Sequence, residues 1–264
     1  MIAKYKAVLP IVLTMLIFPT SSVAESKIVF APIISLSANE FDVTTNQFGG
    51  DSVNYQSIKV GLVSKVENWT LRFSNERPLS NEEIEFNPVM GNSDLDIKNH
   101  DINLSYSFDN DVSVFAGYLN NDFSFTNRNL FVPFGSRADY LTSYSELGFY
   151  YGAGYSYQVG PGTIIATIAY AFLDATYTDN FYEVGLPGLI TDGETTGLSY
   201  SLSWQSNINE NLLYSLGIFV RRFDYDSNFK SGLPEFPGLG KINDNSFDSQ
   251  WNLSAAALTF VYIF

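Results

Sequence analysis

The sequence predicts an all-β protein, and in particular an up-and-down antiparallel β-barrel of about ten strands that crosses a membrane. Three observations lead to this prediction. Apolar and polar residues alternate with period two after residue 25, the connections between these segments are by turns short and long, and the N-terminal segment has the form of an export signal. No later stretch approaches the roughly 18 continuous apolar residues of a membrane-spanning helix.

The first 24 residues predict a secretory signal peptide, which leaves residues 25–264 as the barrel domain. Lys4 and Lys6 supply the positive start, residues 7–18 form an apolar run, and Ser22-Val23-Ala24 fits a small-residue cleavage site. The alternative is a single membrane anchor. It is disfavoured because the apolar run is shorter than the roughly 20 residues that a spanning helix needs.

The composition excludes several classes of protein. The 22 Phe and 17 Tyr residues are too many for a disordered chain, and the absence of cysteine excludes a disulfide scaffold or a thiolate metal site. A net charge of −14 would repel a phosphate backbone, so no nucleic acid partner is expected. We also expect no cofactor.

The predicted strands show one apolar and one small polar face. Residues 198–204, for example, read Leu-Ser-Tyr-Ser-Leu-Ser-Trp, and successive side chains of a strand point to opposite sides. Strands are expected at 27–44, 53–66, 68–77, 98–108, 111–126, 144–158, 162–178, 195–206, 211–226 and 248–264.

Short and long connections alternate between these strands. Short turns are expected at 65–68, 109–111, 159–162 and 207–210, and longer connections at 45–52, 78–97, 127–143, 179–194 and 227–247. Tight periplasmic turns and long external loops give this rhythm in membrane barrels. An even number of strands then places both termini on the periplasmic side.

The chemistry of the two faces favours a membrane barrel over a soluble β-sandwich. The apolar face carries Leu, Ile, Val, Phe and Tyr, which suit lipid, and the other face carries Gly, Ser, Thr, Asn and Ala, which suit a narrow interior. Aromatic residues also fall near the short turns, where an interfacial girdle would lie: Trp69, Phe108, Tyr157 and Trp204.

The C-terminal segment carries the most specific motif. Leu258, Phe260, Tyr262 and Phe264 alternate up to a terminal aromatic residue. This pattern resembles the terminal β-signal of Gram-negative outer-membrane barrel proteins. The resemblance implies location in the outer membrane, contact with its lipids and lipopolysaccharide, and recognition by the barrel assembly machinery. Asn252 and Ser254 share the parity of Leu258, so the strand either leaves the bilayer near residue 254 or contains a bulge.

Parity along the strands predicts which charged residues face the lumen. These residues are Lys59, Arg72, Glu76, Asp101, Glu146 and Arg221, together with Tyr150 and Phe115. Charges of both signs in a narrow interior are expected to pair, because an unpaired buried charge is costly. About ten strands leave an interior filled by side chains, so no general porin is expected. Arg222 would face outward, near lipopolysaccharide phosphates.

The sequence does not favour catalysis or metal binding. The one histidine, His100, precedes Asp101, and neighbours on a strand point apart and cannot readily pair. We therefore expect no enzyme and no metal site, and we interpret the acidic residues of 78–97 as a solvated loop. They are Glu82, Glu83, Glu85, Asp94 and Asp96.

Three external segments are unusually apolar for loops: 130–134, 184–190 and 233–237. Such segments either pack on one another as a cap or bind an apolar ligand or surface partner. The sequence therefore predicts an integral outer-membrane barrel with a non-enzymatic structural or surface-binding role. The alternative function is a narrow channel or an uptake route for a small solute.

Overall fold

The computed structural model describes residues 28–45, 49–79, 83–85, 92–131, 137–181, 189–227 and 249–263. The expected signal peptide, the apolar segment 233–237 and Phe264 lie outside the described residues, as do parts of the segments 130–134 and 184–190.

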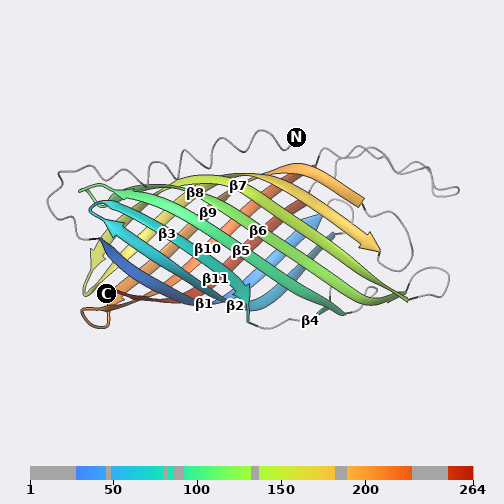
Figure 1. The fold of residues 1–264 in the computed structure, drawn as a ribbon, viewed down its shortest axis with the longest axis horizontal. Coiled ribbons are helices and arrows are strands. Elements are labelled where there is room, and N and C mark those ends of the chain that lie inside the picture. Colours follow the sequence, from blue (N-terminus) through green and yellow to red (C-terminus); the bar gives the residue numbers. More distant parts are fainter. Residues whose placement is uncertain are drawn as a thin grey trace.

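Ten long strands form one closed antiparallel sheet (Figure 1). They are β1 (Val29–Thr45), β2 (Gly49–Val66), β3 (Trp69–Pro78), β5 (Asn92–Ser107), β6 (Val112–Phe131), β7 (Arg137–Val159), β8 (Gly162–Phe181), β9 (Leu189–Asn207), β10 (Leu212–Ser227) and β11 (Ser249–Tyr262). Each pairs with its neighbour in sequence, and β1 pairs with β11 to close the ring. The very short β4 (Glu83–Glu85) lies beside β5. The predicted barrel of about ten strands is confirmed.

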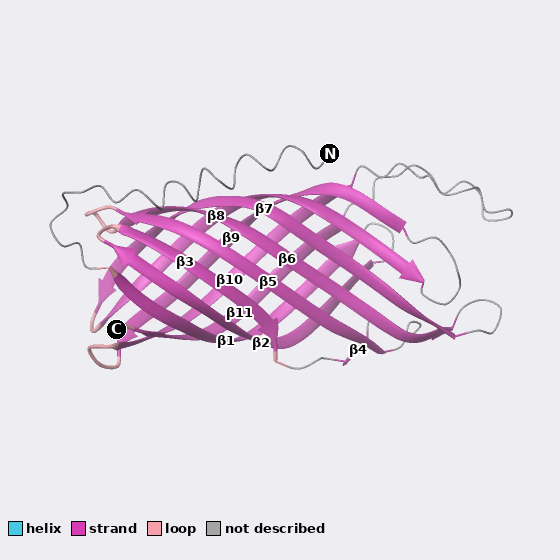
Figure 2. Ribbon diagram, in the orientation of Figure 1, coloured by secondary structure: helices cyan, strands magenta, loops and turns pink. Residues whose placement is uncertain are grey.

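The short turns lie at the end of the barrel that also carries the C-terminus (Figure 2). Glu67, Asp111 and Gly160 adopt positive φ angles of 53°, 63° and 57° in three of these turns, as tight hairpins require. We call this end periplasmic and the opposite end outer, following the orientation of membrane barrels.

A belt of exposed apolar side chains surrounds the periplasmic half. Its members include Phe30, Ile34, Leu36, Val60, Leu62, Phe73, Ile102, Leu104, Val114, Phe149, Tyr151, Ile168, Tyr200, Leu202, Leu216 and Ile218. Such a belt is stable only against hydrocarbon, because water would oppose so much contiguous apolar surface. No helix in the described ranges is long and apolar enough to cross a membrane.

Beyond this belt, the two faces of the barrel wall exchange their chemistry. The outward side chains become polar, for example Glu40, Asn54, Asp96, Asp122, Glu194 and Asp224, while the inward ones become large, apolar and buried. The register of β11 with both neighbours is continuous, so Asn252 and Ser254 face outward above the belt without a bulge. The strand leaves the bilayer near residue 254, which was the first of the two alternatives.

Several strands extend further outward than the sequence analysis predicted. β5 begins at Asn92 instead of 98, β7 at Arg137 instead of 144, and β9 at Leu189 instead of 195. The expected loop 78–97 is therefore wrong in its second part, because Asp94 and Asp96 belong to β5. Glu83 and Glu85 belong to β4, and Glu82 lies outside the described residues. Polar outer faces disguised these extensions as loops.

Candidate functional site

The outer half of the lumen is filled by apolar side chains, which we call the plug. Its members are Phe41, Val53, Tyr55, Ile97, Leu119, Phe123, Ala171, Leu173, Phe223, Trp251 and Leu253. The rings stack on one another: Phe41 lies 5.0 Å from Phe123, and Phe223 lies 4.5 Å from Trp251 between ring centroids. Inward alternation on many strands brings these residues to one axis, where they form a core like that of a soluble protein.

A carboxyl group lies fully buried within the plug. Glu146 on β7 accepts hydrogen bonds from Tyr144 Oη and Trp251 Nε1, each at 3.0 Å, and from Asn121 Nδ2 at 3.1 Å. Tyr144 also shares a hydrogen bond of 2.7 Å with Thr195. Three donors from three strands therefore hold this carboxyl at the centre of the aromatic rings.

Glu146 lies outside the membrane-spanning segments. The neighbours of Leu147 across the sheet are Asn120 and Asp174, both polar and outward-facing, so the belt has ended at this level. Burial raises the pKa of Glu146 to about 7, although its three hydrogen bonds and the charge of Arg221 act in the opposite direction.

A second polar layer contains an ion pair. Lys59 Nζ lies 3.2 Å from Glu76 Oε2, and Ser57 donates a hydrogen bond to the other carboxylate oxygen. Burial acts to raise the pKa of Glu76, but the Lys59 ammonium and the Ser57 hydroxyl outweigh burial and hold that pKa below its ordinary value. Ser37, on β1, extends the chain through a hydrogen bond of 2.6 Å to Ser57.

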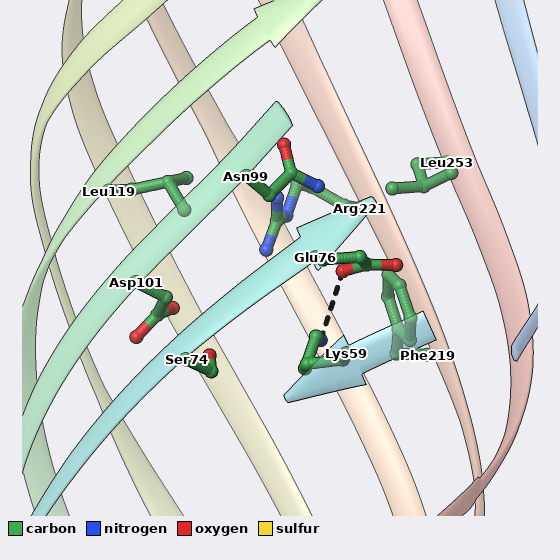
Figure 3. A pocket seen from close by; sticks show the side chains of 9 residues that line it. All are labelled: Lys59, Ser74, Glu76, Asn99, Asp101, Leu119, Phe219, Arg221 and Leu253. Atoms are coloured by element: carbon green, nitrogen blue, oxygen red, sulfur yellow. Dashed lines mark ion pairs between the residues drawn. The ribbon is translucent and has the colours of Figure 1, made fainter. Parts of the chain in front are cut away.

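A small cavity of about 30 Å³ lies between this layer and the plug. Its lining comes from six strands and comprises Lys59, Ser74, Glu76, Asn99, Asp101, Leu119, Phe219, Arg221 and Leu253 (Figure 3). Arg221 forms no ion pair within the described part of the chain, and its Nε has no hydrogen-bond partner there. Its charge nevertheless lowers the pKa of both Glu76 and Glu146. The cavity has room for one or two water molecules.

A third group lies deeper in the periplasmic half. Tyr150 Oη donates to the Asp101 carboxylate at 2.9 Å and accepts from Asn103 at 3.0 Å. Phe115 packs edge-on against Tyr150, with centroids 6.2 Å apart. Arg72 also faces inward but is exposed, so water enters the lumen from the periplasmic end.

The structure thus brings the six predicted lumen charges to the inner face but joins them in separate groups. Lys59 and Glu76 form the printed ion pair, whereas Asp101 bonds to Tyr150 and Glu146 bonds only to neutral donors. The sequence analysis missed the plug residues Phe41, Phe123 and Trp251. The parity of Asn252 and Ser254, which had looked irregular, was the signal that the two faces exchange.

Residues considered for catalysis lie apart from this interior. His100 faces outward on β5, and its ring bonds to Asn75 Nδ2 at 2.8 Å, while Asp101 faces inward. Arg222 is exposed on the outer face, above Val220. Among the described residues, no group of three His, Asp or Glu side chains is arranged to hold a metal ion.

Comparisons with known proteins identify the fold. A scan against protein-family models finds no match, and a search of curated protein sequences finds none either. The outer membrane protease OmpT from Escherichia coli matches with a TM-score of 0.63 at 12% identity, over 92% of this chain and 99% of that chain. The translocator domain of autotransporter NalP from Neisseria meningitidis matches with a TM-score of 0.47 at 12% identity, over 93% and 90% of the two chains.

The likeness to OmpT shows the fold. This chain is a Gram-negative outer-membrane type of β-barrel, as its C-terminal motif had indicated. Barrels of this type lie in the cell outer membrane, and the apolar belt of this chain fits that location.

Proposed function

We propose that the protein is a non-enzymatic integral protein of the outer membrane whose lumen is closed to solutes and whose outer end carries a binding surface. The observation that carries this proposal is the plug, in which Phe123, Phe223 and Trp251 are each at most 2% exposed. Rings packed at this density leave no continuous path for a solute. A closed barrel is a rigid support for the segments that join its strands.

The external apolar segments are the proposed binding surface. Residues 130–134, 184–190 and 233–237 all join strands at the outer end and combine Leu, Phe and Val with Pro or Gly. Apolar sequence on an external connection favours an apolar ligand or surface partner. Replacing Leu233 and Phe236 by Ser should reduce adhesion of cells that display the barrel to an octyl-coated surface, whereas unchanged adhesion would contradict this role.

The remaining partners follow from the barrel wall. We propose that outward Leu258, Phe260 and Tyr262 on β11 serve recognition by the barrel assembly machinery, together with Phe264. Arg222, exposed above the belt, would contact a lipopolysaccharide phosphate. The six inward charges, Lys59, Arg72, Glu76, Asp101, Glu146 and Arg221, serve to hold the lumen together and not to conduct ions.

Planar-bilayer recording tests the closed lumen. The purified protein should give no single-channel steps, whereas a Phe123→Ala/Trp251→Ala variant should conduct because it removes two rings from the plug. Regular steps from the unmodified protein would support the narrow channel instead. Lipid or peptide turnover that His100→Ala abolishes would overturn the non-enzymatic role.

A further inference from the structure

The hydrogen bonds around Glu146 can serve either protonation state of its carboxyl group. The three partners present donors, which suit the ionised form. Asn121 Oδ1, however, is buried and has no hydrogen-bond partner among the described residues. Half a turn of the Asn121 amide would present this acceptor to Glu146 Oε2, which suits the protonated form.

The hydroxyl groups beside the carboxyl are equally adaptable. In the pair formed by Tyr144 and Thr195, either oxygen can be the donor. The direction of this hydrogen bond can therefore reverse when the carboxyl gains or loses its proton, without displacement of an aromatic ring. The geometry is that of a group that can bind a proton in place.

The surroundings of Glu146 provide little compensation for a negative charge. Among the described residues that act on it, β10 supplies the one cation, Arg221, which forms no ion pair with it. β7 supplies Tyr144, on which Tyr225 of β10 packs at 5.3 Å between centroids. The contributions of β6, β9 and β11 are neutral, namely Asn121, Thr195 and Trp251. A buried carboxylate with so little compensation destabilises its surroundings.

We propose that the Glu146 cluster is a proton-binding site that acts as a pH-sensitive latch on the plug. With the proton bound, the rings pack around a neutral carboxyl and the plug is closed. When the proton leaves, the carboxylate draws in water and the plug loosens. The inference rests on the proposed closed lumen, because a latch requires a plug that closes something.

The pH range of the latch follows from linkage. Because burial raises the pKa of Glu146 from 4.5 to about 7, the folded plug binds the proton more tightly than the unfolded chain does. The stabilisation is complete below the unfolded value and is lost as the pH rises through about 7. Closure is therefore expected in mildly acidic medium and loosening in alkaline medium.

Two measurements on the intact barrel in lipid test the latch. Infrared titration should show one carboxyl that ionises near neutral pH, and Glu146→Gln should abolish that signal. Bilayer recordings should show openings that increase about tenfold across the same range, as the ionised fraction does over one pH unit. The matched control Glu194→Gln, on the exposed outer face, should behave as the unmodified protein.

The outcomes separate the latch from the closed lumen. If no carboxyl ionises above about pH 6, or if Glu146→Gln retains the full pH dependence of opening, the latch is wrong. Frequent conduction already in acid medium would overturn the closed lumen, and the infrared titration would still decide the latch. The titration needs no variant to fold, because the unmodified protein alone shows whether the carboxyl exists.

Discussion

The periplasmic and outer halves of this barrel use the same strands with opposite chemistry. On β9 and β10 of the periplasmic half, Leu202 and Ile218 face outward, while Ser201 and Gly217 face the lumen. In the outer half of β10, Phe223 faces the lumen and Asp224 faces outward. Only the parity of the large apolar residues changes, since the strands run on without interruption.

The difference teaches that the hydrophobic effect acts on the surroundings of each level of the wall. Hydrocarbon surrounds the belt, so large apolar residues lie outside and small ones inside. Water surrounds the outer half, so the apolar residues must find one another across the lumen, as they do in any soluble core. The outer half is in effect a soluble β-barrel built on top of a membrane barrel.

The largest effect that tests this comparison is expected for tryptophan truncation. Trp251→Ala should destabilise the barrel by about 4 kcal/mol, because it opens a cavity in the plug and removes a donor from Glu146. Trp204→Ala, on the outward face of the belt, should cost about 1 kcal/mol or less. Urea unfolding in detergent micelles measures both. Equal losses would mean that the plug is not a packed core.

A charge placed on the outer face of the wall should give the next largest effect. Leu202→Arg puts a guanidinium into the belt and should destabilise the barrel by about 3 kcal/mol in lipid. Ser124→Arg, on the outward face of β6 above the belt, should change stability by less than about 0.5 kcal/mol. Unfolding in lipid vesicles compares the two, and similar costs would place the belt boundary wrongly.

Packing inside the periplasmic half can be tested at two inward glycines. A methyl group on Gly117 would overlap the Tyr150 ring, so Gly117→Ala should cost about 2 kcal/mol and displace Tyr150 from Asp101. A methyl group on Gly217 would meet Ser203 Cβ at 3.0 Å, and Gly217→Ala should therefore be milder. Tyrosine fluorescence and urea midpoints report both changes. A neutral Gly117→Ala would show that Tyr150 moves freely.

The smallest effect is expected at the Lys59–Glu76 pair. The pKa of Glu76 is lowered in the folded state, so its contribution to stability is present above the unfolded value and is lost as the pH falls. Lys59→Met should lower stability at neutral pH by about 1 kcal/mol, because Lys59 is partly exposed and solvent screens its charge. The variant should also weaken the acid dependence. An unchanged acid dependence would assign it to other carboxyl groups.

The sequence allowed the membrane part of the fold to be predicted, but not the outer half. The alternation of residues 198–204 and the C-terminal motif pointed to strands with an apolar outer face. Asp94-Leu95-Asp96-Ile97 also alternates, but with its polar residues outward, and its acidic composition was interpreted as a loop. A single facing rule for the whole chain concealed the exchange of the two faces.

The candidate site was predictable to a similar degree. Parity alone indicated that Glu146 and Arg221 face inward, because it needs only the position of neighbours on the same strand. Which charges meet depends on the register between strands far apart in the sequence. Trp251 and Glu146, for example, are separated by 105 positions. Local pattern carries no information on that distance, so the aromatic surroundings of Glu146 could not be foreseen.

The seam between β1 and β11 has a consequence for biogenesis. There, Thr259 donates a hydrogen bond to Ser35 across 224 positions of the chain, and no intermediate strand can substitute for either partner. Such a contact carries a high loop-closure cost and forms late. Until the final strand arrives, both edges of the growing sheet expose unpaired amide groups, which hydrocarbon cannot satisfy. An insertion partner that covers these edges is thus a physical requirement for this chain and not a convenience.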